Sequence, residues 1–398
     1  MSYQILNEGR AKFLACPLEE YRTSDREYVP SKAQVFYNPL MKTNRDIMIS
    51  VLRTLARIND RRIVMGEAMG GLGVRSIRAL LETDGIERAY LNDVSEQACE
   101  LARRNLELNM LSHKAQSTQL DARAFLIAHS SKGHRFDYLD LDPFGSPAHL
   151  LEQALLSIHH NGVIGMTATD TAVLFGACPS KALLRYGSYV ERVPFMKEMG
   201  IRMLIGSSAM TAARHQIGIL PLLVYCEKHY LRGYFTVLRD RSRAHRALKA
   251  LGYLLFSRSA LEWKTAGIAD LAQSVRSFDH EDAKVYGPLW IGEYVDRDFL
   301  QALQDYGSGI SIESDNLLAA LREEASDIIG YCPVSFFARS FDANVPSPRI
   351  LVETARRLGL RASLTHLSSE SIKLDAQPEE FCRLIGKQGP VEDGNPDR

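Results

Sequence analysis

Residues 67–73 read Glu67-Ala68-Met69-Gly70-Gly71-Leu72-Gly73, and this stretch decides the fold that the sequence predicts. A short apolar segment, Arg62 to Glu67, leads into it, and apolar residues at helical spacing follow it at Ile77, Leu80 and Leu81. Glycines at this point let the backbone approach a ligand and begin a helix without a Cβ clash. A strand, a glycine turn and a helix in this order are typical of a parallel α/β sheet.

The same alternation continues along the chain to about residue 240. Further strands are expected at Arg88–Asn92, Ala115–Leu120, Phe136–Leu141 and Gly162–Thr167, with helices between them at Ala98–Leu106, 122–130 and 148–160. Two later apolar segments, Leu220–Tyr225 and Tyr230–Leu238, are expected to form a hairpin at the sheet edge. The prediction is an α/β fold with a mostly parallel sheet flanked by helices.

The pattern changes after Leu238. Residues 239–330 read as helix-rich and irregular, with a break at Tyr286–Trp290, and residues 331–378 read as a small mixed module. These changes predict an N-terminal segment at 1–45, the α/β domain at 46–240, a smaller α+β C-terminal domain at 241–385 and a disordered tail at 386–398.

Composition limits the class of protein without identifying a partner. The 398 residues carry 48 basic and 48 acidic side chains, so any nucleic-acid contact must come from a local basic patch. The six cysteines form no Cys-x-x-Cys pair, which predicts reduced thiols and no zinc or iron–sulfur site. Residues 1–10 lack the apolar core of a secretory signal, and no apolar run reaches ~18 residues. We therefore expect a cytoplasmic protein without a membrane contact.

Acidic residues at three strand ends are candidates for cofactor binding, because ligands of open parallel sheets bind at the carboxyl ends of the strands. Glu67 suits a charged amine better than a phosphate. Asp93 could hold the ribose of S-adenosylmethionine or of a nicotinamide cofactor, or it could cap the next helix, as Ser95 could. Asp121 could accept from an adenine amino group or serve as a helix N-cap. The glycine turn could also be purely structural.

Two arginines favour an anionic group on the ligand. Arg75 lies in the first turn of the helix after Gly73, where a cation is disfavoured by ~0.3–1 kcal/mol. A ligand carboxylate would explain its position, and Arg45 could play the same part. Each arginine could instead lie on the surface or pair with Asp46 or Glu67.

The most informative segment is residues 138–147, in which a buried strand runs directly into Asp142-Pro143-Phe144. Proline fixes φ at about −65° and removes a backbone donor, so the turn would hold the Asp142 carboxylate and nearby carbonyls as acceptors. The Phe144 ring would offer a stacking surface for a base. The alternative is a structural Asp-Pro turn with Phe144 in the core.

This combination suits methylation of an exocyclic amine on a nucleobase. Such an amine is a poor nucleophile, because its lone pair is delocalised into the ring. Acceptors that hold its N–H groups would aim the lone pair at a sulfonium methyl and stabilise the positive charge that develops on nitrogen. The alternatives are methylation of adenine N6 or of a protein amide, a non-catalytic RNA-binding module, and a nicotinamide oxidoreductase, for which no acid–base pattern accompanies the glycines.

A set of segments between about residues 8 and 376 carries a more specific resemblance. The segments are Val35-Phe36-Tyr37-Asn38-Pro39, Asn44-Arg45-Asp46, Asn92-Asp93, Asp140-Leu141-Asp142-Pro143-Phe144-Gly145-Ser146-Pro147, Thr167-Ala168-Thr169-Asp170, Tyr286-Gly287-Pro288-Leu289-Trp290 and Thr365-His366. Together they resemble the tRNA guanine-26 N2-dimethyltransferase family. Asp142-Pro143-Phe144 alone resembles the broader Asp/Asn-Pro-Pro-aromatic motif of nucleic-acid amino-methyltransferases.

The resemblance implies a class I (Rossmann-like) methyltransferase domain, S-adenosyl-L-methionine as cofactor, and transfer of one or two methyl groups to N2 of a guanine in tRNA, at position 26. The implied cofactor contacts are Arg45, Arg75, Asp93, Asp121 and Ala122, and Glu67 joins them from the reasoning above. The implied catalytic residues are Phe36, Asp142 and Phe144. The two rings would sandwich a flipped guanine, and Asp142 would accept from its N2. Without the resemblance, Phe36 reads as a core aromatic.

The chain departs from the family pattern in two places. Many members carry paired cysteines before the Gly-Pro-Leu-Trp segment, whereas this chain has none between Cys226 and that segment, so we predict no structural zinc. Gly73-Val74-Arg75 stands where the family has Gly-Ile-Arg. The sequence leaves open whether one or two methyl groups are added, and at one tRNA position or two.

The expected partner is tRNA, with no DNA and no obligate protein partner. The basic run 239–249 predicts a phosphate-binding patch, although it could be only a solvated helix face. The other residues assigned to this patch are Arg202, Arg214, His215, Lys228, His229 and Arg232. The module around residues 349–366 is expected to add contacts. A guanine stacked in folded tRNA must leave the stack to react, at a cost of roughly a few kcal/mol.

Overall fold

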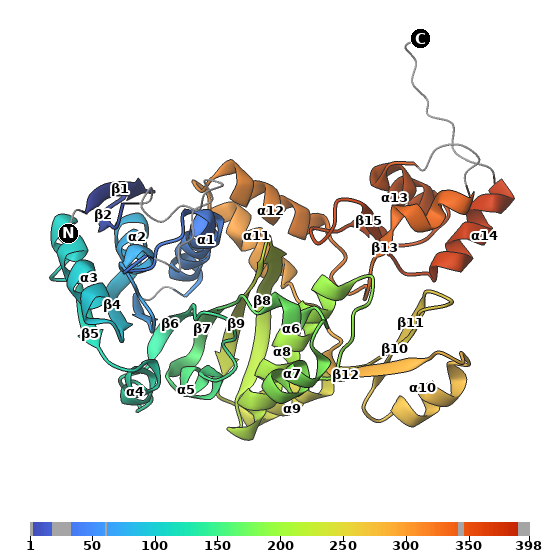
Figure 1. Cartoon of the computed structure of the whole chain (residues 1–398), viewed down its shortest axis with the longest axis horizontal. Helices are drawn as coiled ribbons and strands as arrows, with labels where there is room; N and C mark the ends of the chain where they lie inside the picture. Colours follow the sequence, from blue (N-terminus) through green and yellow to red (C-terminus); the bar gives the residue numbers. More distant parts are fainter. Residues whose placement is uncertain (1–2, 18–32, 60–61, 341–345, 389–398) are drawn as a thin grey trace, which may run out of the picture.

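The centre of the molecule is a seven-stranded sheet with the order β5-β4-β3-β6-β7-β9-β8 (Figure 1). The structure is a computed structural model that describes residues 3–17, 33–59, 62–340 and 346–388. The strands of this sheet are β3 (Ile63–Glu67), β4 (Ile86–Asp93), β5 (Ala115–Gln119), β6 (Phe136–Leu141), β7 (Ile158–Ala168), β8 (Gly218–Glu227) and β9 (Tyr230–Leu238). Strands β3 to β7 are parallel, and β9 is antiparallel to both of its neighbours. The predicted α/β class and edge hairpin are confirmed.

Helices cover both faces of this sheet. The helices in this part of the chain are, in order, α1 (Lys42–Ile58), α2 (Val74–Glu82), α3 (Glu96–Leu108), α4 (Ala122–Ala128), α5 (Leu151–Leu156), α6 (Thr171–Leu174), α7 (Pro179–Tyr186), α8 (Met196–Arg214) and α9 (Arg241–Lys249). Helices α1 and α2 lie above the sheet in Figure 1, and α4, α5 and α8 lie below it. Because both faces are covered, β6 is buried along nearly its whole length, which explains its continuous apolar run.

The residues just before α2 and α3 explain why these helices begin where they do. Gly73 precedes α2 with a left-handed backbone, φ +73°, and a Cβ there would lie 2.8 Å from Leu91 Cδ2. The Ser95 hydroxyl accepts from the Ala98 N–H at the start of α3. Each parallel strand therefore passes into its helix at one edge of the sheet, where ligands of such folds bind.

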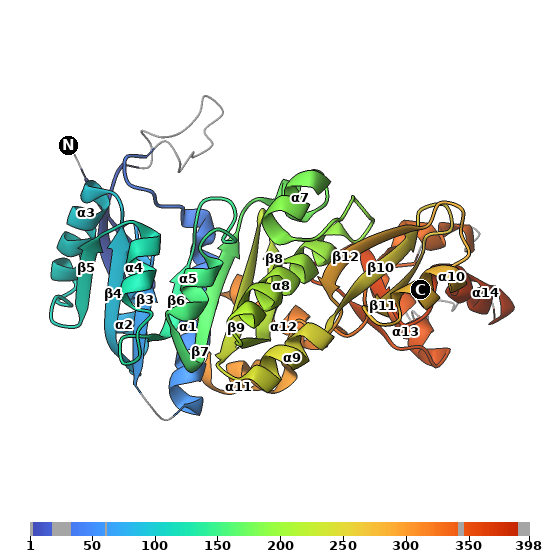
Figure 2. The ribbon, with the colours of Figure 1, turned by 90° about the horizontal axis from the view of Figure 1, so that it is seen from below.

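The chain after α9 builds two smaller three-stranded sheets, with orders β11-β10-β12 and β13-β15-β14. Its elements are β10 (Leu251–Ser257), β11 (Glu262–Gly267), α10 (Leu271–Ser277), β12 (Lys284–Trp290), α11 (Arg297–Tyr306), α12 (Ile312–Glu323), β13 (Cys332–Pro333), η4 (Val334–Ser340), α13 (Pro348–Arg357), β14 (Ala362–Leu364), β15 (Ser371–Leu374) and α14 (Pro378–Gln388). Figures 1 and 2 place both sheets at the end of the molecule away from β5. Helices α11 and α12 instead return to pack against α1.

A short hairpin, β1 (Gln4–Glu8) and β2 (Ala11–Ala15), begins the described chain, and η3 (Pro39–Met41) precedes α1. The hairpin packs on α2 and α3, where Asn105 Oδ1 accepts from the Leu14 N–H at 2.7 Å. Asn38 caps η3 by accepting from the Leu40 N–H. One continuous core joins these elements to the large sheet, and a smaller cluster of buried residues lies under η4, α13 and α14.

Two predictions about secondary structure are wrong, and a third has the wrong boundary. Residues 148–160 do not form one helix, because α5 ends at Leu156 and β7 begins at Ile158, with Asn161 in a left-handed backbone conformation. Residues 239–330 contain strands β10 to β12, and the expected break at Tyr286–Trp290 lies inside β12. The predicted tail at 386–398 begins within α14, and residues 389–398 lie outside the described part. No helix among the described residues is long and apolar enough to span a membrane.

Candidate functional site

The glycine turn after β3 lies beside the ends of the neighbouring strands. The Gly71 N–H donates to Asp93 Oδ2 at 2.9 Å, and the Gly70 N–H donates to the Asn92 carbonyl at 2.7 Å. A Cβ on Gly71 would lie 3.3 Å from the carbonyl oxygen of Phe36. The turn is therefore in contact with the N-terminal segment that carries Phe36.

The acidic groups at the ends of β4 and β5 have different local roles. Asp93 is partly buried, and its second oxygen accepts from the Ser95 N–H, while Ser95 itself caps α3. Asp121 is exposed and caps α4, accepting from two backbone N–H groups through Oδ1. Ala122, the first residue of that helix, is half-buried. Both carboxylates lie at the edge of the sheet where a nucleoside would bind.

The corner after β6 brings together the three residues assigned to catalysis. Asp142 is partly exposed, and Phe144 directly after Pro143 is 73% exposed, so its ring is not in the core. The Phe36 ring, 37% exposed, meets the Phe144 ring edge to face, with centroids 4.8 Å apart and planes at 89°. The alternative prediction, that Phe36 and Phe144 are aromatic residues of the core, is wrong. A sandwich around a base requires the two rings to separate and turn.

Arg75 is buried and connects this corner to the residues beneath it. Its guanidinium donates to Asp142 Oδ2 and, at 2.8 Å, to Asn44 Oδ1, and it lies 3.5 Å from Asp140 Oδ1. Burial alone would lower the pKa of Arg75, but Asp142 and Asp140 outweigh it and hold that pKa above its ordinary value. The arginine is charged and is paired with carboxylates other than the two considered from sequence, Asp46 and Glu67.

The hydrogen-bond partners of Arg45 are residues other than Asp142. Its guanidinium forms a bidentate ion pair with the Glu8 carboxylate on β1, at 2.6 and 2.5 Å, and also donates to the Asn38 carbonyl. Burial would raise the pKa of Glu8, but Arg45 and Arg78 outweigh it and lower this pKa to about 2. Arg45 therefore fixes the N-terminal hairpin beside the segment that carries Phe36. Its assignment to a cofactor carboxylate stays a prediction.

Glu67 is buried at the end of β3, directly ahead of the glycines. Its Oε2 accepts from the Ser76 hydroxyl at 2.5 Å. Burial raises the pKa of Glu67 to about 8, although the Ser76 hydrogen bond opposes the rise. The side chain is therefore mostly protonated at neutral pH and would ionise when a cationic group is placed beside it.

Glu67→Gln is expected to change how stability depends on pH. The pKa of a glutamate in an unfolded chain is about 4.3, whereas the folded value is about 8, so between them the unfolded state ionises and the native state keeps its proton. Native stability from this group is therefore present at low pH and falls as the pH rises to about 8. The variant should gain on the wild type by at most ~1.4 kcal/mol per pH unit across this window. Urea unfolding at about pH 5 and about pH 8 measures the difference, and a constant difference would contradict a protonated Glu67.

Two residues assigned to the basic patch are buried in ion pairs, and for them the prediction is wrong. Arg232 is fully buried in β9 and pairs with Asp140, while Arg202 in α8 pairs with Glu198 at 2.7 Å. Arg239, at the start of the basic run, donates hydrogen bonds to three backbone carbonyls around the end of α5. The guanidinium groups of Arg202 and Arg232 are buried and are therefore not available to a phosphate.

The rest of the basic run lies at the edge of the sheet opposite to the corner that carries Asp142 and Phe144. Because β9 is antiparallel to β7, its last residue, Leu238, lies near the start of β7, and Asp142 follows the opposite end of β6. The exposed basic residues of α9 in this run are Arg241, Arg243, His245, Arg246 and Lys249. Lys228 and His229, in contrast, are exposed in the β8–β9 turn at the same edge as Asp142.

Sequence reasoning missed a buried polar cluster that joins α8 to the C-terminal part of the chain. Glu324 accepts from Thr365 and His366, and Lys373 lies 3.0 Å from Glu198 on α8. The available signal was Thr365-His366, quoted above only as part of a motif. No group of three or more His, Cys, Asp or Glu side chains in the described ranges is placed so that it could hold a metal ion.

The chain is similar to known proteins over nearly its whole length. The family model described as N2,N2-dimethylguanosine tRNA methyltransferase matches residues 17–385. A tRNA (guanine(26)-N(2))-dimethyltransferase of Thermococcus kodakarensis is 32% identical over 358 residues, which cover 86% of this chain and 91% of the relative. A tRNA (guanine(26)-N(2)/guanine(27)-N(2))-dimethyltransferase of Aquifex aeolicus is 30% identical over 390 residues, covering 96% and 95%. The solved structure of Trm1 from Pyrococcus horikoshii with S-adenosyl-L-methionine has a TM-score of 0.80 at 29% identity and covers 96% of this chain and 99% of that chain.

Proposed function

We infer the function of this chain from a family membership: it belongs to the N2,N2-dimethylguanosine tRNA methyltransferases. It is an S-adenosylmethionine-dependent enzyme that methylates N2 of guanine 26 in tRNA. The observation in the molecule that carries this function is the corner after β6. There a carboxylate and two partly exposed aromatic rings meet beside a glycine turn.

The residues around the glycine turn fit the nucleoside half of the cofactor. We propose that Asp93 accepts from the ribose hydroxyls and that Asp121 and Ala122 hold the adenine, because these residues follow the ends of adjacent strands. The backbone hydrogen bonds that Asp93 accepts from Gly71 and Ser95 fix its carboxylate without using all of its lone pairs.

The amino-acid half of the cofactor carries one amine and one carboxylate. We propose that Glu67 faces the amine, since a cation would favour the ionised form of this buried acid. Arg75 is the proposed partner of the carboxylate, because its guanidinium already reaches Asp142 at the corner. Arg45 supports the same region through Glu8 and Asn38.

When bound, the cofactor supplies an electrophilic methyl group on a sulfonium. The chain's own residues orient the amine that receives it. We propose that Asp142 accepts a hydrogen bond from N2 of the guanine and stabilises the positive charge that develops there. Phe36 and Phe144 hold the base on its two faces, which offsets part of the cost of removing it from the RNA stack.

The test of the function is a nucleoside analysis of tRNA after incubation with the protein and S-adenosylmethionine. We expect N2-methylguanosine to appear first and N2,N2-dimethylguanosine to follow, both at position 26. Mass spectrometry of nuclease fragments also reports whether guanine 27 is modified. A methyl group found on adenine, or no transfer to tRNA, would contradict the proposal.

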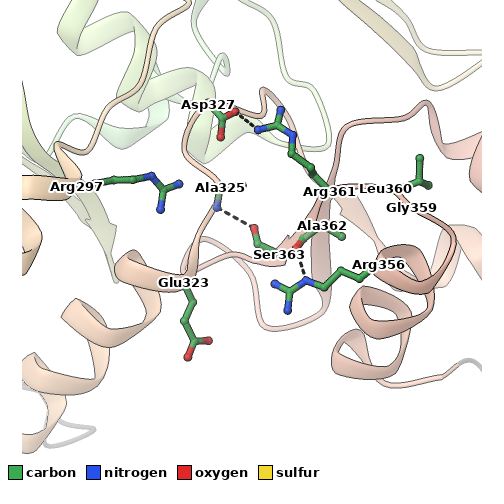
Figure 3. Close-up of a pocket in the computed structure, with 10 residues that line it drawn as sticks. All are labelled: Arg297, Glu323, Ala325, Asp327, Arg356, Gly359, Leu360, Arg361, Ala362 and Ser363. Atoms are coloured by element: carbon green, nitrogen blue, oxygen red, sulfur yellow. Dashed lines mark hydrogen bonds and ion pairs between the residues drawn. The ribbon is translucent and has the colours of Figure 1, made fainter.

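We propose that residues 46–240 act as the cofactor domain and residues 241–385 as the tRNA-binding domain. A hollow of about 440 Å³ lies in the second part and is lined by Arg297 and Arg356. Figure 3 shows these two arginines extending toward each other from opposite sides. Arg361 at its rim is paired with Asp327 at 2.6 Å. Arg356 donates one hydrogen bond to the Ala362 carbonyl, and its other N–H groups could donate to an RNA phosphate.

Arg356→Gln should weaken tRNA binding in a salt-dependent way. If Arg356 contacts one phosphate, its loss should reduce the slope of log affinity against log salt by roughly 0.7–0.9. Arg357→Gln is the matched control, because Arg357 is exposed on the same helix and does not line the hollow. Filter binding over a range of salt concentrations measures both slopes. Equal slopes for the two variants would contradict a phosphate contact at Arg356.

The reaction is proposed to take place in the cytoplasm. All six cysteines are free in the structure, as expected for a protein kept in a reducing compartment.

A further inference from the structure

Helix α7 presents two apolar side chains to solvent. Leu184 is 85% exposed and Leu183 is 52% exposed, while Ala182 and Tyr186 of the same helix are buried. Single exposed leucines are common on protein surfaces, so exposure alone assigns no role. The position of Leu184 is more informative, because it shares a hollow of about 490 Å³ with Phe144. This volume lies within the range of about 300–1,000 Å³ that is typical of ligand sites.

A chain of hydrogen bonds fixes α7 against the reacting corner. The Ser146 hydroxyl donates to the Tyr186 oxygen at 2.7 Å, and the Tyr186 hydroxyl donates to Asp170 at 2.7 Å. Arg185 Nη1 donates to the other oxygen of Asp170 at 3.0 Å. Ser146 follows Phe144 by two residues, so Leu184 and Phe144 are held as parts of one surface.

The rim of this hollow carries cationic and hydrogen-bonding groups. Arg185 and His149 both line it, and both are exposed. Asp170 takes one donor of Arg185, and a guanidinium has further donors in a planar arrangement that suits phosphate. An apolar floor beside a guanidinium is the combination that a nucleotide, with its flat base and anionic phosphate, would recognise.

We propose that this hollow binds the nucleotide next to the target guanine, with its base against Leu184 and its phosphate on Arg185. The inference rests on the proposed function, which places the target guanine on Phe144. Extrusion of that guanine removes a stacking partner from the adjoining base. An apolar side chain at that place compensates for the lost stacking. Leu184 is thus a positioning residue that stabilises the opened RNA and does not touch the reacting atoms.

The test compares Leu184→Ala with Leu183→Ala, its matched control on the same helix outside the hollow. We expect Leu184→Ala to lower kcat/KM for tRNA by roughly 10-fold, because the base loses part of the apolar contact area that the leucine buries. Leu183→Ala should stay within about twofold of the wild type, a span close to the usual effect of a neutral surface substitution. The KM for S-adenosylmethionine and the melting temperature should not differ between the two variants.

A second substrate series separates base stacking from a general effect on activity. The same kinetics are measured on tRNAs that lack the base at position 25 or at position 27. The Leu184→Ala defect should disappear on one of these substrates and persist on the other, which identifies the bound neighbour. A defect that persists on both, or equal rates for the two leucine variants, would overturn the inference. A wild-type protein that transfers no methyl group to intact tRNA would overturn the proposed function itself.

Discussion

Replacing Asp142 with asparagine is expected to lower kcat for methyl transfer by about 100- to 1,000-fold, the usual cost of removing one preorganised electrostatic contact. Asparagine keeps an oxygen that can accept from N2 of the guanine. It removes the negative charge that stabilises the positive charge on nitrogen as the bond to carbon forms. Because this interaction strengthens in the transition state, the loss should appear in kcat and much less in KM for tRNA.

The same substitution has a second consequence that can be measured without catalysis. Asp142 pairs with Arg75, and an amide at position 142 weakens that pair. Since Arg75 is the proposed partner of the cofactor carboxylate, calorimetry should give an affinity for S-adenosylmethionine equal to or tighter than that of the wild type. Asp84→Asn, at an exposed aspartate after α2, is the control. Unchanged kcat in Asp142→Asn would remove Asp142 from the mechanism.

The parts of the fold that could be predicted are those with local signals. The glycine turn at Gly70–Gly73 and the run from Phe136 to Leu141 each combine a hydrophobic pattern with a residue type that permits few alternatives. The C-terminal strands could not be predicted in this way. A short apolar run such as Leu251–Ser257 fits a buried helix as well as a strand, and only its pairing with β11 and β12 decides between them.

The candidate site also contains residues that local sequence could identify and residues that only the fold brings together. The corner at Asp142 and Phe144 is continuous in sequence, so its chemistry could be inferred from one segment. Phe36 reaches that corner from more than a hundred residues away, and its assignment came only from the resemblance. The resemblance alone also gave no hint that Arg75 pairs with Asp142, because that contact depends on how α2 and β6 lie in the sheet.

The pairing of Arg232 shows most clearly what sequence alone could not supply. Its sequence context, near Lys228 and His229, resembles a basic surface patch. In the structure the β9 register places Arg232 opposite Thr167, and its guanidinium reaches Asp140 across 92 positions in the chain. Burial would raise the pKa of Asp140, but Arg232 and Arg75 outweigh it and hold this pKa below its ordinary value. A patch of charge can be read from a sequence, whereas the direction in which each side chain points cannot.

Arg232→Met is therefore expected to destabilise the protein by about 3–5 kcal/mol, the usual cost of removing one partner of a buried ion pair. Asp140 would keep only its longer contact with Arg75 and its hydrogen bond from Tyr138. Arg75 would then be drawn toward Asp140 and away from Asp142, so kcat should fall as well. Urea unfolding measures the first effect, and methyl transfer to tRNA below the unfolding transition measures the second.

The double variant Asp140→Asn/Arg232→Met distinguishes this account from a simple loss of packing. Removing both charges leaves no uncompensated carboxylate, so the double variant should be more stable than Arg232→Met alone. A loss of packing predicts the reverse, because each substitution would then add its own cost. Arg214→Met, at an exposed arginine in the last turn of α8, should change stability by less than about 0.5 kcal/mol. If Arg232→Met were equally harmless, the buried pair would not support the reacting corner, and the position of Arg75 would need another cause.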